Sequence, residues 1–228
     1  MVDLNSGIGA LFDLDGVLID SEGMYTDFWN GVDAIYPTGI NDFAHVIKGC
    51  TLPHILDTYF PEQERQEHIK RLLEQHEQTM EYRLFDGVYD FVYALKERGI
   101  PMAIVTSSTR IKMSHMIEQL PDFAALFTDI VTSEDVCHGK PDPEGYLVGA
   151  RHIDIDPKNC VVFEDSINGL KAGHAAGAYV VAIATTNPKE LLKGYSNVVL
   201  DGLNPSYIGQ LFPVIKNALL YRNAFFIG

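Results

Sequence analysis

The chain is poor in cysteine and shows none of the residue spacings of a zinc site. Its three cysteines, Cys50, Cys137 and Cys160, are far apart in the sequence and form no CxxC pair. This spacing favours free thiols in a reducing compartment over a disulfide framework. The eight histidines form no HxH or HxxxH pair either, so zinc-dependent catalysis is not expected.

Positive charge is also scarce. Lys and Arg number 17 against 31 Asp and Glu, which gives a formal net charge of −14. Phosphate backbones and anionic bilayers are bound by a surplus of Lys and Arg, so we expect neither a nucleic-acid partner nor a membrane partner. An acidic protein can still bind a small anion where a cation or a local basic group lies in the site.

Long apolar runs are missing as well. None approaches the roughly 20 residues that a membrane-spanning helix needs, and residues 1–5 lack the basic start of a signal peptide. We therefore expect a cytoplasmic protein. The hydrophobic share of 46% and the charged share of 21% are typical of a globular chain. A length of 228 residues allows one domain with a smaller insert.

Short apolar runs of strand length alternate with stretches of helical periodicity. The runs cover residues 8–12, 101–105, 129–132, 160–163, 179–184 and 197–200. This alternation predicts an α/β fold, a Rossmann-like doubly wound parallel sheet with helices on both faces. Ligands of such sheets bind outside the carboxyl ends of the strands. The polar residues that follow the runs are therefore the first candidates for a site.

The region between residues 21 and 84 contains no strand-like run. Its apolar residues recur at helical spacing. One stripe consists of Met24, Phe28, Val32 and Ile35. We expect an inserted α-helical domain over residues 21–84 and a core domain made of residues 1–20 and 85–228.

Two aspartates, Asp13 and Asp15, directly follow the first apolar run. Residues two apart in an extended chain share a face, so both carboxylates are expected to point into the same crevice. Two like charges at this distance need a cation or a shared proton, and Mg²⁺ takes oxygen ligands of this kind. Because Asp and Gly16 also suit a turn, this segment alone fits a turn and a metal site equally well.

Polar residues follow other runs in the same way. Glu164 and Asp165 follow the fourth run, and Thr106 and Ser107 follow the second, where hydroxyls at a helix start can hold a phosphate. Lys140 lies in a loop stiffened by glycine and proline, just ahead of a helical stretch. Loops at this edge of a parallel sheet carry function more often than packing. We therefore expect these side chains to meet in one site.

The order and spacing of these segments resemble the haloacid dehalogenase superfamily, in its phosphatase and phosphomutase branch with a helical cap. The residues that match its four motifs are, in order, Asp13 with Asp15, Thr106, Lys140, and Glu164 with Asp165. The insert over residues 21–84 lies at the cap position of the family. The resemblance covers essentially the whole chain.

The resemblance implies a magnesium-dependent transfer of a phosphoryl group. Asp13 would be the nucleophile that forms an aspartyl-phosphate. Asp15 would act as acid and then as base, with its backbone carbonyl on the metal. Asp165, together with Glu164, would complete the Mg²⁺ site with Asp13.

Two further residues would bind the phosphoryl group itself. Thr106 would donate to one of its oxygens, and Lys140 would balance its charge, the electrostatic effect that dominates phosphoryl transfer. Asp15 argues against halide displacement, the founding reaction of the family, because a halide leaving group needs no proton.

The cap resembles that of β-phosphoglucomutase at Lys48 and Gly49, but other positions depart from it. Thr51 and Leu52 replace a Ser-Arg pair that grips the second phosphate in the mutases, and Tyr25 replaces a histidine. Leucine cannot replace a bidentate phosphate grip. We therefore expect a phosphatase that acts on a small phosphorylated metabolite, such as a sugar phosphate. A sugar phosphomutase is the alternative, and a non-catalytic binding module is disfavoured because the motif set is complete.

Three residues are candidates for substrate binding. Ser107 lies beside Thr106, and Tyr25 is expected to face the substrate from the cap. Arg110 starts the next helix and can assist phosphate binding, although an ordinary surface arginine fits slightly better. His138 near Lys140 fits a solvated loop histidine. We expect a monomer or a weak homodimer.

Overall fold

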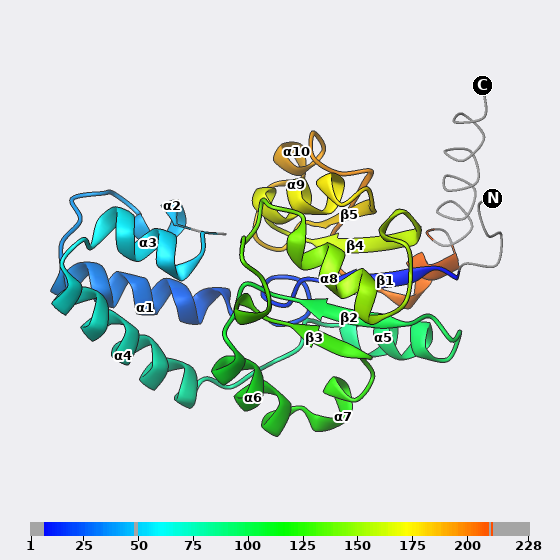
Figure 1. Cartoon of the computed structure of the whole chain (residues 1–228), viewed down its shortest axis with the longest axis horizontal. Helices are drawn as coiled ribbons and strands as arrows, with labels where there is room; N and C mark the ends of the chain where they lie inside the picture. Colours follow the sequence, from blue (N-terminus) through cyan, green and yellow to red (C-terminus); the bar gives the residue numbers. More distant parts are fainter. Residues whose placement is uncertain (1–6, 48–49, 210, 212–228) are drawn as a thin grey trace.

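The computed structural model describes residues 7–47, 50–209 and 211 of the chain. Within this part, six parallel strands form one sheet in the order β3-β2-β1-β4-β5-β6 (Figure 1). The strands are β1 (Gly9–Phe12), β2 (Met102–Val105), β3 (Asp129–Val131), β4 (Cys160–Glu164), β5 (Tyr179–Ile183) and β6 (Val198–Leu200). Each predicted run is confirmed as a strand, and so is the doubly wound α/β fold.

The strand order places β1 at the point where the winding of the sheet reverses. β2 and β3 add on one side of β1, and β4, β5 and β6 add on the other. Ala10 of β1 pairs with Met102 of β2, and Gly9 pairs with Cys160 of β4. Open α/β sheets bind ligands at such a switch point, outside the carboxyl ends of the strands. The residues that follow β1 and β4 therefore lie where a ligand is expected.

Alternate residues of the strands face two apolar layers. Phe12 packs in the layer of α5 (Val88–Lys96), α6 (Arg110–Gln119) and α7 (Pro121–Ala124). Leu11 packs in the layer of α8 (Glu144–His152), α9 (Ile167–Ala175) and α10 (Lys189–Leu192). Strands covered on both faces read as continuous apolar runs rather than alternating ones. This explains why the strands were visible in the sequence.

An aromatic group lies directly beneath the end of β1. Phe12 stacks on Phe163 with ring centroids 4.6 Å apart, and meets Phe91 and Phe127 edge-on at 6.4 and 5.9 Å. Aromatic pairs in these geometries stabilise a fold by more than the burial of their apolar surface alone. Asp13 therefore follows directly on a residue that is held by three aromatic contacts.

In the described part of the chain, four helices lie between β1 and α5, in the region proposed as the cap, and they are called the cap below. They are α1 (Glu22–Ile35), α2 (Phe43–Val46), α3 (Leu52–Tyr59) and α4 (Gln63–Thr79). Figure 1 shows them beside the carboxyl ends of the strands. They share an apolar cluster of their own, which includes Trp29, Phe43, Phe60 and Ile69. This cluster supports our proposal that residues 21–84 are a separate domain. None of the described helices is long and apolar enough to cross a membrane.

The buried face of α1 differs from the predicted stripe. Ile35 is 53% exposed, whereas Trp29 and Val32 are 7% and 1% exposed. Tyr25 and Tyr36 pack against the same cluster. Positions i, i+4 and i+7 share one side of a helix, and aromatic rings bury more area than aliphatic chains. The inward face of α1 therefore follows Tyr25, Trp29, Val32 and Tyr36, and the prediction that Ile35 belongs to the buried stripe was wrong.

Two adjacent chain segments connect the cap to the sheet. The Asp20 N–H donates to the Arg83 carbonyl at 2.9 Å, and the Phe85 N–H donates to the Leu18 carbonyl at 3.1 Å. Helix α4 of the cap also packs against α6. Gln119 of α6 bonds the backbone of the returning segment with both ends of its amide. Helix α6 is therefore the platform on which the base of the cap lies.

We expect Phe163→Ala to lower the free energy of unfolding by about 3–5 kcal/mol, because the ring is fully buried in the aromatic group. Tyr93→Ala is the control: the residue is 47% exposed, and loss of its side chain should change stability by only about 0.5 kcal/mol. Urea unfolding measures both. Equal losses in the two variants would contradict this account of the core.

Candidate active site

A cavity of about 550 Å³ lies between the carboxyl ends of the strands and the cap. The predicted residues that line it are Asp13, Asp15, Tyr25, Thr106, Ser107, Lys140, Glu164 and Asp165. They belong to the last residue of β4, to the segments that follow β1, β2, β3 and β4, and to cap helix α1. The fold thus brings together all predicted site residues except Arg110.

Asp13 directly follows β1, and its side chain is 11% exposed. Its N–H donates to the carbonyl of Phe163 at 2.9 Å, which holds the chain where it leaves the sheet. Burial raises the pKa of Asp13 to about 7, even though the charge of Lys140 lowers it. The carboxylate therefore needs further positive charge nearby to stay ionised.

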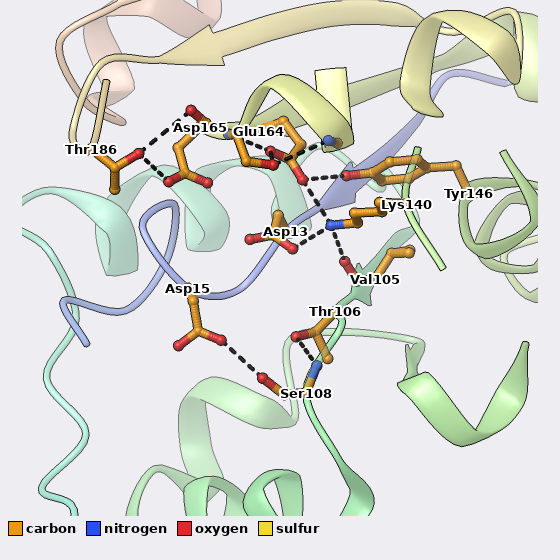
Figure 2. A network of polar contacts seen from close by, with 12 residues as sticks. Asp13, Asp15, Val105, Thr106, Ser108, Lys140, Tyr146, Glu164, Asp165 and Thr186 are labelled. Atoms are coloured by element: carbon orange, nitrogen blue, oxygen red, sulfur yellow. Dashed lines mark hydrogen bonds and ion pairs between the residues drawn. The ribbon is translucent and has the colours of Figure 1, made fainter. Parts of the chain in front are cut away.

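The ammonium of Lys140 lies at the centre of the site (Figure 2). It donates to Asp13, to Glu164 at 2.7 Å and to the carbonyl of Val105 at 3.2 Å. Burial alone would lower the pKa of Lys140, but the carboxylates of Asp13 and Glu164 raise it well above its usual value. A fully charged ammonium thus lies between two buried acids.

Glu164 ends β4 and is 1% exposed. One of its oxygens accepts from Lys140 and, at 3.2 Å, from the Tyr146 hydroxyl. The other accepts from the N–H and the hydroxyl of Ser166, at 2.7 and 3.0 Å. Because both oxygens have protein partners, Glu164 holds Lys140 in place.

Asp165 lies against the turn that follows Asp15. Its carboxylate accepts from the hydroxyl of Thr186, in the loop after β5 (Figure 2). Gly16 approaches it so closely that a Cβ there would lie 2.2 Å from an oxygen of Asp165. Gly16 also has a φ of +79°, which side chains rarely adopt. The glycine after the second aspartate is therefore required by both the turn and the close approach.

Three carboxylates of the site form one acidic cluster. Oxygens of Asp13, Glu164 and Asp165 lie within 4.8 Å of one another, and all three residues are buried. Burial and the two neighbouring acids raise the pKa of Asp165 well above its usual value. Buried like charges of this kind are stabilised by a hard cation, which prefers oxygen ligands. The donor set therefore fits a divalent metal ion.

Asp15 has different surroundings from Asp13. Its side chain is 31% exposed. It accepts from Lys112 at 2.6 and 2.7 Å, from the Ser108 hydroxyl at 2.9 Å and from the Ser21 hydroxyl. Burial would raise the pKa of Asp15, but Lys112 and the hydroxyls hold it below its usual value. Environments that push two neighbouring pKa values apart are typical of carboxylates with different roles.

Thr106 directly follows β2. Its hydroxyl oxygen accepts from the Ser108 N–H at 3.0 Å (Figure 2). The hydroxyl proton can then be donated to an anion in the cavity. Ser107, which is exposed, lines the same cavity next to the start of α6. Hydroxyls and N–H groups at a helix start are a common anion-binding arrangement.

Known proteins resemble the chain over most of its length. A family profile described as "Haloacid dehalogenase-like hydrolase" matches residues 10–183. The chain belongs to the haloacid dehalogenase-like hydrolase family. It is 33% identical over 186 residues to hexitol phosphatase A of Escherichia coli K12, covering 77% of this chain and 82% of that one.

Two further relatives of this haloacid dehalogenase-like hydrolase agree with that result. A bifunctional riboflavin kinase/FMN phosphatase of Arabidopsis thaliana is 27% identical over 213 residues, or 85% of this chain; the chain spans only 53% of that protein. A crystal structure of a HAD hydrolase, family IA, variant 3, from Entamoeba histolytica HM-1:IMSS has a TM-score of 0.77 at 26% identity, covering 92% of this chain and 99% of that one. The predicted family and class of enzyme are confirmed.

Arg110 is the predicted residue that lies apart from the others. Its guanidinium binds Asp135 and its side chain is 63% exposed. Its N–H donates to Glu134. Asp135 holds the guanidinium of Arg110 outward, and Arg110 does not line the cavity described above. His138 is also a solvated loop residue, 72% exposed and bonded to Glu144.

Two predictions concern cap residues. Tyr25 lines the cavity, but its hydroxyl donates to Glu77 of α4 at 2.8 Å, and burial together with nearby acids raises the pKa of Tyr25 well above its usual value. Its contact with substrate stays a prediction. Lys48 and Gly49 lie outside the described residues.

Lys112, Glu77 and Tyr146 were missed by the sequence reasoning. Lys112 is 1% exposed and lies on the same face of α6 as the buried Met113 and Met116. A lysine in the apolar stripe of a helix is the signal that could have found it. Glu77, 6% exposed in α4, carries the same kind of signal.

Gly169→Ala should disturb the site through Glu164, because its Cβ would lie 1.6 Å from a carboxylate oxygen of that residue. We expect a loss of about 1–3 kcal/mol of stability together with lost activity, since Glu164 holds Lys140. Gly31→Ala is the matched control: it lies in α1 with open space around its Cβ, so it should be neutral or stabilising by up to about 1 kcal/mol. Thermal unfolding and turnover measure both. Similar behaviour of the two variants would contradict the packing described.

Proposed function

We propose that the protein is an Mg²⁺-dependent phosphatase that hydrolyses a small phosphate monoester through an aspartyl-phosphate on Asp13. The observation that carries the proposal is the placement of Asp13 beside the Lys140 ammonium at the floor of the cavity, with Asp15 two residues further along. Attack by a carboxylate divides a difficult hydrolysis into two easier steps. The complete motif set argues against a binding module without catalysis.

Asp13 and Asp165, with the backbone carbonyl of Asp15, are the proposed ligands of Mg²⁺. Glu164 belongs to the same cluster, but we assign it chiefly to Lys140 because both its oxygens have protein partners. When bound, Mg²⁺ supplies charge that offsets the phosphoryl oxygens and helps to keep Asp13 ionised.

In the first step, an oxygen of Asp13 attacks phosphorus, and the bond from phosphorus to the leaving oxygen breaks. Asp15 donates a proton to that oxygen, so that an alcohol leaves. Lys140 and the Thr106 hydroxyl hold the phosphoryl oxygens and offset their charge. In the second step, Asp15 takes a proton from water, which attacks phosphorus and releases phosphate and free Asp13.

Asp15 must change protonation state between these steps. Without ligand, Lys112 and the hydroxyls favour its ionised form by lowering its pKa. An incoming phosphate ester brings negative charge into the cavity, which favours proton uptake by Asp15. Release of the alcohol leaves Asp15 ionised again and ready to accept a proton from water.

The cap side of the cavity favours a monophosphate over a bisphosphate. Leu52 lines the cavity at the position where the resemblance to the mutases would place an arginine. Trp29 and Ile55 add apolar surface, and Glu77 adds an acid. The relationship to hexitol phosphatase A supports a phosphorylated sugar or polyol as substrate. A sugar phosphomutase remains the alternative, and conversion of glucose 1-phosphate to glucose 6-phosphate, followed by NMR, distinguishes it.

We expect hydrolysis of p-nitrophenyl phosphate to require Mg²⁺ and to stop when EDTA removes it, because the single charge of Lys140 cannot offset both the acidic cluster and a phosphate dianion. Asp13→Asn should lose more than about 10³-fold in kcat, as expected when a nucleophile is removed. Asp122→Asn, at an exposed position of α7, is the control and should keep full activity. Turnover that persists in EDTA would contradict the metal assignment.

A further inference from the structure

Lys112 is a buried lysine to which the scheme above gives no step. It lies on α6, and the residue is 1% exposed. Its ammonium is 2.6 and 2.7 Å from the two oxygens of Asp15. On the cap side, the same ammonium lies 4.5 Å from the ring centroid of Tyr25, within the range of a cation–π contact. Lys112 therefore joins the acid of the core to helix α1 of the cap.

Tyr25 is itself held by a second cap helix. Its hydroxyl donates to Glu77 of α4 at 2.8 Å, and Glu77 is 6% exposed. Helix α4 packs against both α1 and α6. Asp15, Lys112, Tyr25 and Glu77 thus form one continuous series of contacts from the end of β1 to the cap.

Lys112 and Asp15 differ in how deeply their side chains are buried, and this difference indicates which of the two orients the other. An ammonium removed from water is strongly unfavourable unless an anion contacts it, and Asp15 is the carboxylate in direct contact with Lys112. The side chain of Asp15 is 31% exposed and can be hydrated without Lys112, whereas that of Lys112 is 1% exposed. Lys112 therefore fixes the orientation of Asp15 more than Asp15 fixes that of Lys112.

We propose that Lys112 is a positioning residue which, supported by Tyr25 of the cap, aims the carboxyl of Asp15 at the leaving oxygen of the substrate. This inference rests on the proposed function, in which Asp15 protonates that oxygen. Lys112 itself transfers no proton in this scheme. Lys112 thereby makes the orientation of the Asp15 carboxyl depend on Tyr25, a side chain of the cap.

Two esters with different leaving groups test this role. Phenyl phosphate and 2,4-dinitrophenyl phosphate carry the same phosphoryl group, but phenolate needs a proton to leave far more than dinitrophenolate does. Their kcat/KM values report the steps up to release of the phenol. Lys112→Met should lower kcat/KM about 10–100-fold for phenyl phosphate and less than about threefold for the dinitrophenyl ester, since misplacing an acid forfeits part of its ~10²–10⁴ contribution.

Tyr25→Leu, which removes the ring that supports Lys112, should show the same selective loss at about 3–10-fold. The double variant Lys112→Met/Tyr25→Leu should show no larger loss of kcat/KM for phenyl phosphate than Lys112→Met alone, because Tyr25 acts on Asp15 through Lys112. Lys171→Met is the matched control. Its ammonium lies 5.4 Å from the ring centroid of Tyr195, away from the cavity, and both esters should be hydrolysed as by wild type.

Equal losses with both esters in Lys112→Met would indicate a merely structural role and overturn the proposal, and so would unchanged kinetics. If thermal unfolding shows that Lys112→Met is not folded, Tyr25→Leu is the deciding variant. Equal losses with both esters, or unchanged kinetics, in Tyr25→Leu would then overturn the proposal. A wild-type enzyme that hydrolyses neither ester would instead overturn the proposed function itself.

Discussion

The buried ammonium of Lys140 contacts Asp13 and Glu164 at once, at the point where the sheet changes its direction of winding. Neither acid could be placed there alone, because a carboxylate withdrawn from water needs a compensating charge. The rest of the site follows from this group. Ser166 and Tyr146 orient Glu164, and Glu164 in turn orients Lys140. The excess of acid that remains is what a divalent cation would neutralise.

A second lysine gives the other aspartate a separate environment. Lys112 and two hydroxyls surround Asp15, so its pKa is lowered while that of Asp13 is raised. Two carboxylates only two residues apart thereby acquire different protonation behaviour. This difference suits a scheme in which one carboxylate attacks phosphorus and the other handles protons. The difference arises because burial outweighs the charge of Lys140 at Asp13, whereas Lys112 and the hydroxyls outweigh burial at Asp15.

Much of the core could be predicted because its signals are local. The apolar runs that became β1 and β4 end directly before Asp13 and Asp165, so the strand ends and the acids were visible together. Thr106 after the second run and Lys140 in its stiff loop were expected in the same site, and the resemblance to a known family assigned them roles. The match of the family profile to residues 10–183 confirms the family, while the roles of the individual residues stay proposals.

Contacts between distant segments could not be predicted in this way. Lys112 lies 97 residues from Asp15 in the sequence, and Tyr25 lies 52 residues from Glu77. Periodicity can indicate which face of α6 or α4 turns inward, but the partner that a buried side chain meets there depends on how the cap packs on the sheet. Arg110 shows the same limit: its position after Thr106 suggested phosphate, but Asp135 of a neighbouring loop determines where its side chain lies.

Trapping the phosphoenzyme tests the central claim, that Asp13 accepts the phosphoryl group, most directly. The enzyme would be mixed with an excess of phenyl phosphate and Mg²⁺, quenched in acid during turnover and treated with borohydride, which reduces an acyl phosphate to an alcohol. We expect peptide mass spectrometry to find homoserine in place of Asp13 and an unmodified Asp15. Reduction at another carboxylate, or none in an enzyme that is turning over, would contradict the account.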